Sequence, residues 1–344
     1  MTAVETERAA MIADSLAHRD VIDRLHAEGL TDGLPVIPPT AARVQIMLAG
    51  RNPMRVLGLI PPLSRPVDMR ALAICAVLAG CQPQEFSALV TASTALMDPQ
   101  LNLLGVATTT GNTAVGMILH PGLADQLEAN AGANTFGPGN RVNASLGRSL
   151  ALVVRLIGGA QPGSIDMATI GQPAKFGCCL AERQPPAPWQ SLPIRRELKD
   201  TFAVSVFATS GVVEVADTWS STGRGLLETL AAAVPLPTAL GRGGTQLGGG
   251  EIVALIPPEW AQKLVDDGWS QDEVAAFVYE QSAFPVERIP PALRAQVQTE
   301  KVLMSASTPD DVTVLVAGGV GTKAALLPSW PGGSHSVTRA IESE

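Results

Sequence analysis

The spacing of apolar residues predicts helices in the first third of the chain. Between residues 4 and 29, apolar positions recur at a helical period that closes at Gly29. The segments VDMRALAICAVLAG and EFSALVTASTALM continue with helical runs, and Gly80 ends the first of them. Between these regions, the prolines of TDGLPVIPPT favour an extended path. We expect an N-terminal helix and a proline-stiffened arm over residues 1–50.

Short apolar runs predict strands in the rest of the chain. Residues 114–132 and 251–269 share one plan, namely a short apolar strand, a proline turn and a helix. DVTVLVAGGVGTKAALLPSW predicts a further strand-loop-helix unit, and LNLLGVATTTGN predicts a strand that ends near Thr109. This alternation indicates an α/β fold with two similarly built lobes. We place them at residues 51–190 and 191–344, connected by the proline-rich segment ERQPPAPWQSLPI.

The composition fits such a fold and narrows the partners. Of 344 residues, 46% are hydrophobic and only 4% aromatic, which indicates a core of small and branched aliphatic side chains. The formal net charge is −8, and no basic run carries interleaved aromatic residues, so we expect no nucleic-acid partner. The apolar runs are too short to span a bilayer, and the first residues lack the apolar run of a signal peptide. The four cysteines show neither CxxC spacing nor a disulfide framework, so we expect a reduced, cytoplasmic protein without a membrane partner.

The segment GANTFGPGNRVNASLGRSL predicts an anion site at the start of a helix. Asn140 or Asn143 is the expected N-cap of the apolar run that follows. Unpaired N–H groups and the helix dipole favour an anion there, and Arg141 would add a bidentate donor for a carboxylate or phosphate. Alternatively, residues 137–139 form a plain turn, Asn143 is only a cap and Arg141 lies on the surface.

The glycines of VAGGVGTKAALLP predict a second polar loop. A strand, a glycine-rich turn and a helix form the general layout of a phosphate-cradling loop, so Gly319 and Thr322 would contact the substrate and Lys323 would supply a cation. Thr109 would join them from the end of another strand. The spacing matches neither a Walker A loop nor a dinucleotide-binding loop. Close packing of a strand on a helix is the alternative reason for these glycines.

The segment GQPAKFGCCLAERQ supplies a candidate nucleophile and a candidate acid or base. Lys175 and Glu182 lie near Cys179 in the sequence, and a neighbouring cation lowers the pKa of a thiol. An inert, buried Cys179 is the alternative, because cysteine is among the most buried residue types. The histidines show no metal-ligand spacing, so we predict no metal site, although His120 at a strand-to-helix turn is a possible acid or base.

Asp32 is the candidate that the proline-stiffened arm would bring to the site. Prolines reduce the conformational freedom of the free chain, so the arm can hold Asp32 in a fixed place as a base or orienting group. The arm would close over its own lobe or over a neighbouring subunit, and we therefore expect a homo-oligomer, most simply a homodimer. An ordinary stiff connector is the alternative.

Four blocks of the sequence together resemble one bacterial family. They are TDGLPVIPPT, GANTFGPGNRVNASLGR, GGAQPGSIDMATIGQPAKFGCCLAE and VAGGVGTKAALLPSW with SVTRAI, and the chain is similar in them to the family associated with UGSC-motif (seleno)proteins. Members often occur with, or fused to, a small domain carrying a Cys/Sec-Gly-Ser-Cys motif, which implies thiol or selenol redox chemistry. This chain contains no CGSC motif, and GTKAALLP lacks a histidine after Lys323.

These observations predict an enzyme that acts on a small anionic, carboxylate-bearing metabolite at a site between two lobes. The expected reaction is addition, elimination or bond cleavage of the lyase or hydrolase type, in which Glu182, Cys179 or Lys323 would transfer protons or attack. No motif implies a cofactor. The alternative is a subunit or small-molecule-binding protein that works with a separate CGSC redox partner in a reductase system.

Overall fold

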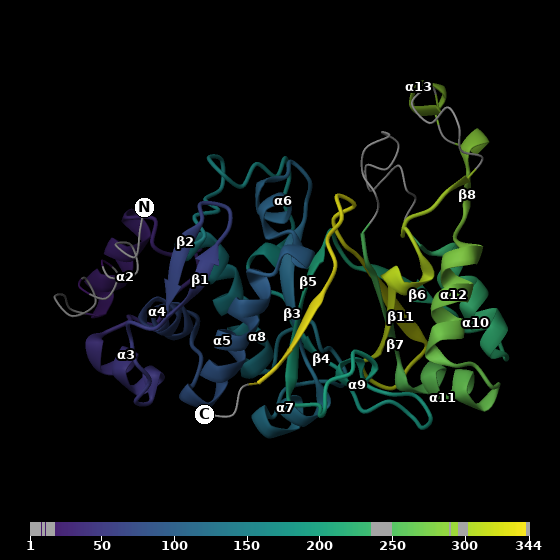
Figure 1. The fold of residues 1–344 in the computed structure, drawn as a ribbon, viewed down its shortest axis with the longest axis horizontal. Coiled ribbons are helices and arrows are strands. Elements are labelled where there is room, and N and C mark those ends of the chain that lie inside the picture. Colours follow the sequence, from purple (N-terminus) through teal and green to yellow (C-terminus); the bar gives the residue numbers. More distant parts are fainter. Residues whose placement is uncertain are drawn as a thin grey trace.

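Two sheets stacked face to face form the centre of the molecule. The computed structural model describes residues 8, 11, 18–234, 250–288, 290–294 and 302–341. Each sheet has four strands of mixed direction, and helices cover its outer face, so the fold is α/β as expected (Figure 1). The layers follow one another as helices, sheet, sheet and helices along the longest axis.

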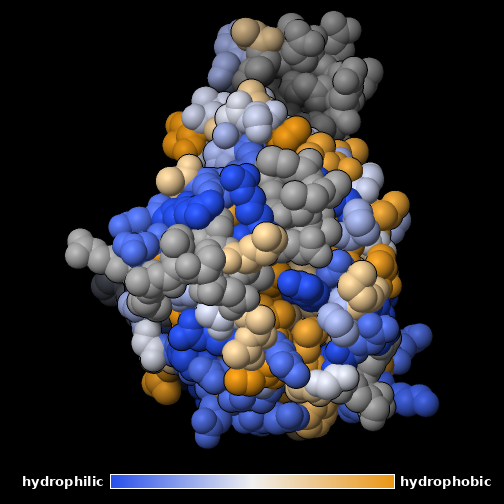
Figure 2. Space-filling model, turned by 90° about the vertical axis from the view of Figure 1, so that its left-hand side faces the viewer, coloured by the Kyte–Doolittle hydropathy of each residue, from blue (hydrophilic) through white to orange (hydrophobic). Residues whose placement is uncertain are grey.

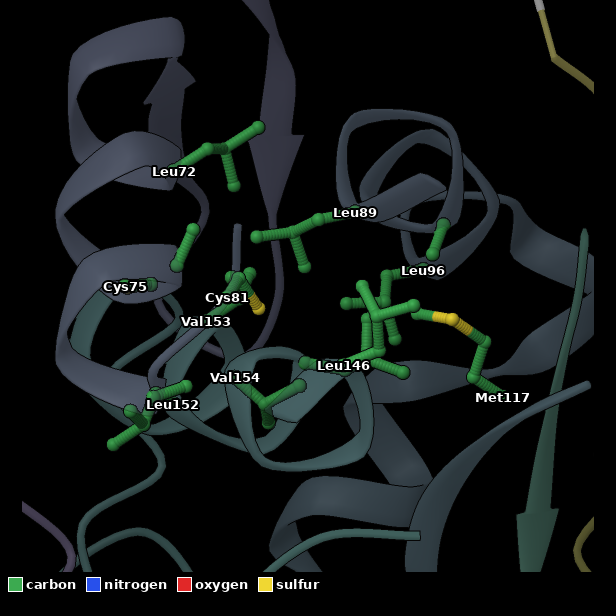
Figure 3. Packing of buried hydrophobic residues seen from close by; sticks show 14 of the residues in the cluster. Leu72, Cys75, Cys81, Leu89, Leu96, Met117, Leu146, Leu152, Val153 and Val154 are labelled. Atoms are coloured by element: carbon green, nitrogen blue, oxygen red, sulfur yellow. The ribbon is translucent and has the colours of Figure 1, made fainter. Parts of the chain in front are cut away.

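The first sheet carries the helices that lead to the candidate site. Its strands are, in order, β12 (Val337–Ala340), β5 (Ala203–Thr209), β3 (Ala114–Leu119) and β4 (Cys179–Ala181). Strands β3 and β4 are parallel, whereas β5 is antiparallel to both of its neighbours. Helices α5 (Phe86–Leu96) and α8 (Arg141–Leu152) pack on the outer face, and α4 (Met69–Ala79) packs against α8. Figure 3 shows the apolar side chains that fill this layer, from Leu72 to Met117 of β3.

The second sheet repeats the plan of the first. Its strands are, in order, β10 (Val312–Val316), β7 (Ile252–Ile256), β11 (Lys323–Pro328) and β6 (Val213–Ala216), and only β10 and β7 are parallel. Helices α10 (Gly223–Ala232) and α12 (Gln271–Gln281) cover its outer face. In both sheets the parallel inner strand leads into a helix that begins with proline, namely α7 (Pro121–Leu127) after β3 and α11 (Pro258–Asp266) after β7. The shared plan predicted for residues 114–132 and 251–269 is therefore confirmed.

The first sheet takes two of its four strands, β5 and β12, from the part of the chain after residue 190. Strand β6 follows β5 in sequence but joins the second sheet, and β12 follows β11 but joins the first. The boundary expected between residues 190 and 191 therefore does not separate the sheets, because β5 and β12 lie beyond it and complete the first one. The proline-rich segment that spans this boundary leads from β4 to β5 within that sheet.

An apolar layer joins the two sheets. Side chains along a strand alternate between its two faces, so every second residue points toward the opposite sheet. Ile118 and Phe207 of the first sheet cluster there with Leu255 and Leu315 of the second. The two sheets therefore share one core between them.

The remaining elements surround the first sheet and the far end of the second. They are α2 (His18–Ala27), α3 (Ala41–Leu48), the hairpin of β1 (Val56–Ile60) and β2 (Arg65–Asp68), α6 (Leu103–Thr108), α9 (Leu192–Arg195), α13 (Pro291–Arg294), and the short strands β8 (Phe284–Pro285) and β9 (Val302–Leu303). On the side of α2 and α3, hydrophobic residues lie among hydrophilic ones (Figure 2). None of the described helices is long and apolar enough to cross a membrane.

Several local predictions are confirmed and two are wrong. Helix α2 occupies the end of the predicted N-terminal helix, most of whose earlier residues lie outside the described part of the chain. Gly80 ends α4 in the left-handed region, with a φ of 91°. The predicted strand before Thr109 is helix α6, and the predicted helix after Gly321 is strand β11.

Candidate functional site

A cavity of about 280 Å³ opens beside the C-terminal end of α8. Its walls come from α6, the start of β3, the end of α8, the arm at residue 32 and the segment 160–176. Most of the wall is apolar, and Val106, Val154 and Phe176 contribute to it. All the lining residues precede residue 177, so this cavity belongs to the arm and the first lobe. Its position differs from the expected one, which was between two lobes.

Four charged side chains line this cavity. They are Asp32, Arg155, Asp166 and Lys175. A few charged groups on an otherwise apolar wall are typical of sites that orient a small ligand.

Arg155 lies in an irregular turn at the end of α8. The helix continues as a π-turn, η3 (Val153–Ile157), and the N–H of Gly158 donates to the carbonyl of Val153 over 3.0 Å. A π-turn shifts the positions of the side chains around the helix axis and occurs frequently at functional sites. Val153 remains fully buried in the core, whereas Arg155 lines the cavity.

Arg155 has no hydrogen-bond or ion-pair partner among the residues that the structure describes. Its Nε atom is buried and unpaired. Burial lowers the pKa of the guanidinium, and the nearby Asp32 carboxylate opposes this change. A buried N–H without an acceptor is costly, so this guanidinium is suited to an anion from outside the chain.

Asp32 lines the cavity while bound to Arg148. The guanidinium holds the carboxylate through two contacts, from Nε at 2.7 Å and from Nη2 at 2.8 Å, and also donates to the carbonyl of Pro35. Burial tends to raise the pKa of Asp32, but the hydrogen bonds and charge of Arg148 outweigh it and hold this pKa below its ordinary value. The arm is thus fastened to α8 with an ionised Asp32 at the cavity.

Lys175 and Asp166 form the second charged pair of the cavity wall. The Lys175 Nζ lies 2.6 Å from Asp166 Oδ2, and both side chains are partly exposed. The pair combines a proton donor and a proton acceptor in direct contact. A proton can therefore return from one to the other after a reaction step.

The polar residues predicted at the start of α8 are occupied by structural bonds. Asn140 is the N-cap, as expected, and its side chain accepts from the N–H of Asn143. The Asn143 side chain is buried and bonds to the backbone of Asn130 and Thr135. Arg141 pairs with the fully buried Glu85 at 2.6 Å. These side chains therefore fasten a loop and a buried carboxylate, and none of them lines the cavity near Arg155.

The second predicted loop also lies away from the cavity. Gly319 packs against the loop before α8, since a Cβ at Gly319 would lie 2.7 Å from the Cα of Ala133. The Thr322 carbonyl accepts from Asp217, and the Lys323 Nζ lies on the surface, 3.3 Å from Glu214. Gly319 therefore serves close packing, which was the alternative interpretation, although its partner is a loop and not a helix. Gly318 and Gly321 have open space beside them and adopt φ values of 94° and 156°.

Thr109 ends α6, close in sequence to the cavity wall but outside it. Its hydroxyl accepts from the N–H of Gly111 over 3.1 Å. The cavity is lined instead by Val106 and Ala107 on one side of Thr109 and by Thr113 on the other. Thr109 therefore shapes the connection between α6 and β3.

Cys179 has the environment of an inert core thiol. It is 5% exposed. Burial raises its pKa well above the ordinary value, and the nearby thiols Cys178 and Cys81 add to this effect. A thiolate nucleophile is therefore disfavoured. Lys175, the cation predicted to lower the pKa of this thiol, is instead bound to Asp166.

Glu182 is part of a buried hydrogen-bonded chain. Its carboxylate lies 2.6 Å from His120 Nδ1, and His120 Nε2 lies 2.7 Å from the Ser205 hydroxyl. The Ser205 hydroxyl bonds to Thr338 on β12, which accepts from Arg196. An arginine only donates and a carboxylate only accepts, so with a neutral His120 imidazole the order of donation runs from Arg196 through the hydroxyls and His120 to Glu182.

The order Ser205, His120 and Glu182 matches that of a hydrolase triad, but its position does not favour catalysis. All three side chains are at most 1% exposed. The hydroxyl that would attack a substrate is held by Thr338. This chain of bonds links β3, β4, β5 and β12, and Glu182 is therefore assigned a structural role in place of the predicted proton transfer.

Of the predicted catalytic residues, only Asp32 lines the cavity. Arg155 and Asp166 are not among the predicted site residues, yet the sequence contains a signal for the first. Arg155 is the only charged residue between Arg148 and Asp166, and a lone charge in an apolar run needs a partner or a ligand.

Among the described residues, no three His, Cys, Asp or Glu side chains come together in a way that could hold a metal ion. Comparison with models of known protein families finds no match to the chain, and comparison with curated proteins finds none either.

Proposed function

We propose that this protein is an enzyme that acts on a small anionic metabolite, with Arg155 as the anchor for the acidic group. The observation that carries the proposal is the buried, unpaired Nε of Arg155 in a cavity with largely apolar walls. A volume of about 280 Å³ lies near the lower end of the range for ligand pockets and fits a small molecule better than a dinucleotide.

Addition or elimination of the lyase type is the reaction that the charged pair supports best. In elimination, Asp166 takes a proton from the carbon next to the acidic group, and the C–H electron pair becomes the new double bond. The leaving hydroxyl departs with its own bonding pair and takes a proton from Lys175 to become water. The proton on Asp166 then returns to Lys175 across their 2.6 Å contact, and addition of water follows the reverse order.

This proposal moves the chemistry away from several residues predicted from the sequence. Arg155 replaces Arg141 as the anion anchor, and the pair of Asp166 and Lys175 replaces Cys179 as the reacting group. Asp32 remains at the site as a positioning residue, since its carboxylate is bound to Arg148. A homo-oligomer and a cytoplasmic location remain part of the proposal.

Ligand binding without catalysis is the second candidate. The ion pair of Lys175 and Asp166 is complete without a ligand, as expected of a pair that only shapes the cavity wall. The chain would then bind its ligand as a subunit, and a separate CGSC protein would supply the redox chemistry.

Turnover of a metabolite pool by the purified chain tests the first candidate. The chain is incubated with small hydroxy and unsaturated acids, and mass spectrometry follows a loss or gain of 18 mass units, the approximate mass of water. Lys175→Gln removes the charge and the proton donor, so we expect turnover to fall by about 100-fold or more.

Lys263→Gln is the matched control, because Lys263 forms a similar pair with Asp267 at 2.7 Å on α11. It should retain the activity of the unmodified chain. Equal turnover in the Lys175 and Lys263 variants would remove the proposed chemistry, and binding alone would become the leading account.

A further inference from the structure

The charges around the cavity define what kind of anion it can neutralise. The charged lining residues and their ion-pair partners are three cations, Arg148, Arg155 and Lys175, and two carboxylates, Asp32 and Asp166. Two of the cations are already matched by the two carboxylates. One positive charge, on Arg155, is left in excess within this group.

The apolar walls define the rest of the ligand. Leu103 and Val106 of α6, Val154 of the π-turn and Phe176 face the same cavity as Arg155. Such walls favour an aliphatic or aromatic body, because contact with them removes apolar surface from water. A ligand with several polar groups would lose hydration there without gaining partners.

We infer that the ligand is an organic monocarboxylate with a compact apolar body, and that its carboxylate binds Arg155. This inference rests on the proposed function and narrows its substrate class. A single carboxylate matches both the planar donor geometry of a guanidinium and the one unmatched charge. A phosphate ester or a dicarboxylate would bring a second negative charge next to Asp32 and Asp166, where like charges repel.

A set of ring compounds that differ in charge tests the substrate class. Benzoate carries one negative charge, benzamide has nearly the same shape without the charge, phenyl phosphate carries up to two negative charges, and terephthalate carries two carboxylates. Acetate provides the carboxylate without the apolar body. Binding of each to the full chain is measured by ligand-observed NMR titration at fixed ionic strength. We expect benzoate to bind more tightly than each of the other four, by roughly 10-fold or more.

Arg155→Met tests the anchor, since methionine keeps an unbranched apolar stem without the charge. It should weaken benzoate binding by roughly 10- to 100-fold, the usual effect of losing a hydrogen bond to a charged group, and leave benzamide binding nearly unchanged. Arg224→Met is the control, because Arg224 is 67% exposed and forms a surface pair with Glu228. It should leave both affinities unchanged.

The outcomes separate this inference from the proposed function. If phenyl phosphate or terephthalate binds more tightly than benzoate and loses its affinity in Arg155→Met, the monocarboxylate class is overturned while the anion site stands. If benzamide or acetate binds as well as benzoate, the class is overturned too. If Arg155→Met leaves the binding of every anion unchanged, the anion anchor fails, and the proposed function fails with it.

Discussion

The four cysteines lie in the packed core, and their reactivity should follow from that position. All four are buried, and burial raises the pKa of Cys178 to about 12 and that of Cys81 to about 12. Because the thiolate is the reactive form, we expect none of the four to react with a thiol reagent within minutes at pH 8. In guanidinium chloride all four should react. Rapid labelling of Cys179 in the native protein would contradict the buried state and restore a thiol mechanism.

Arg141 should matter for stability and not for ligand binding. Its partner Glu85 is fully buried, so Arg141→Ala would leave a carboxylate without its cation. Because Arg141 is itself 46% exposed, we expect a loss of about 1–3 kcal/mol in the free energy of unfolding, measured by urea denaturation. Benzoate affinity should remain that of the unmodified chain. Unchanged stability with reduced affinity would instead support the anion site predicted from the sequence.

At the scale of elements, the sequence predicts those helices whose ends carry local signals. Asn140 caps α8 as expected, and Thr40 caps α3 in the same way, because each side chain accepts from an N–H three residues on. Strand β11 is missed because its Lys, Ala and Leu residues favour a helix, whereas pairing with β7 and β6 on both sides decides its structure. Helix α6 is missed because a short apolar run does not distinguish a helix from a strand.

The need for a local signal in the sequence also explains which residues of the candidate site could be predicted. Asp32 is predicted because prolines mark its arm. Arg155 is missed because its position depends on a π-turn, and the ion pair of Asp166 with Lys175 depends on how residues 160–176 fold over the cavity. Side chains whose bonds cross between distant segments leave no periodic pattern in the sequence.

A pH-dependent ion pair connects the segment before β12 to the turn before β10 of the second sheet. His335 Nε2 lies 2.8 Å from Asp311 Oδ1, and this hydrogen bond raises the pKa of His335. Burial tends to raise the pKa of Asp311, but the hydrogen bond from His335 outweighs it and holds this pKa below its ordinary value. A raised histidine pKa stabilises the fold fully below about pH 6.5, and this contribution is lost as the pH rises through the folded-state pKa. The lowered pKa of Asp311 contributes above about pH 4 and is lost at lower pH.

His335→Gln should therefore destabilise the protein more at pH 5.5 than at pH 9. We expect a difference of no more than about 1 kcal/mol, because His335 is one-third exposed to solvent. Urea denaturation at the two pH values measures it. An equal effect at both would mean that the contact acts through packing and not through charge.

At the scale of the whole molecule, the path of the chain from β11 in the second sheet to β12 in the first predicts that the two sheets unfold together. Strand β12 completes the first sheet, and just before it Ser336 donates to the buried Glu251 at the entrance to β7 in the second. Deletion of residues 336–344 would remove an edge strand from one sheet and leave Glu251 without these bonds next to the other. We expect a loss of more than about 3 kcal/mol in the free energy of unfolding.

Hydrogen exchange measured by mass spectrometry can follow β3 and β7 separately in this deletion variant. Exchange should accelerate in both strands, because the apolar layer between the sheets is shared and the bond network around Glu251 is broken. Deletion of residues 342–344 alone is the matched control, since it leaves β12 complete, and it should not change either rate. Faster exchange in β3 with full protection of β7 would show that the sheets unfold as independent units, as two separate lobes would.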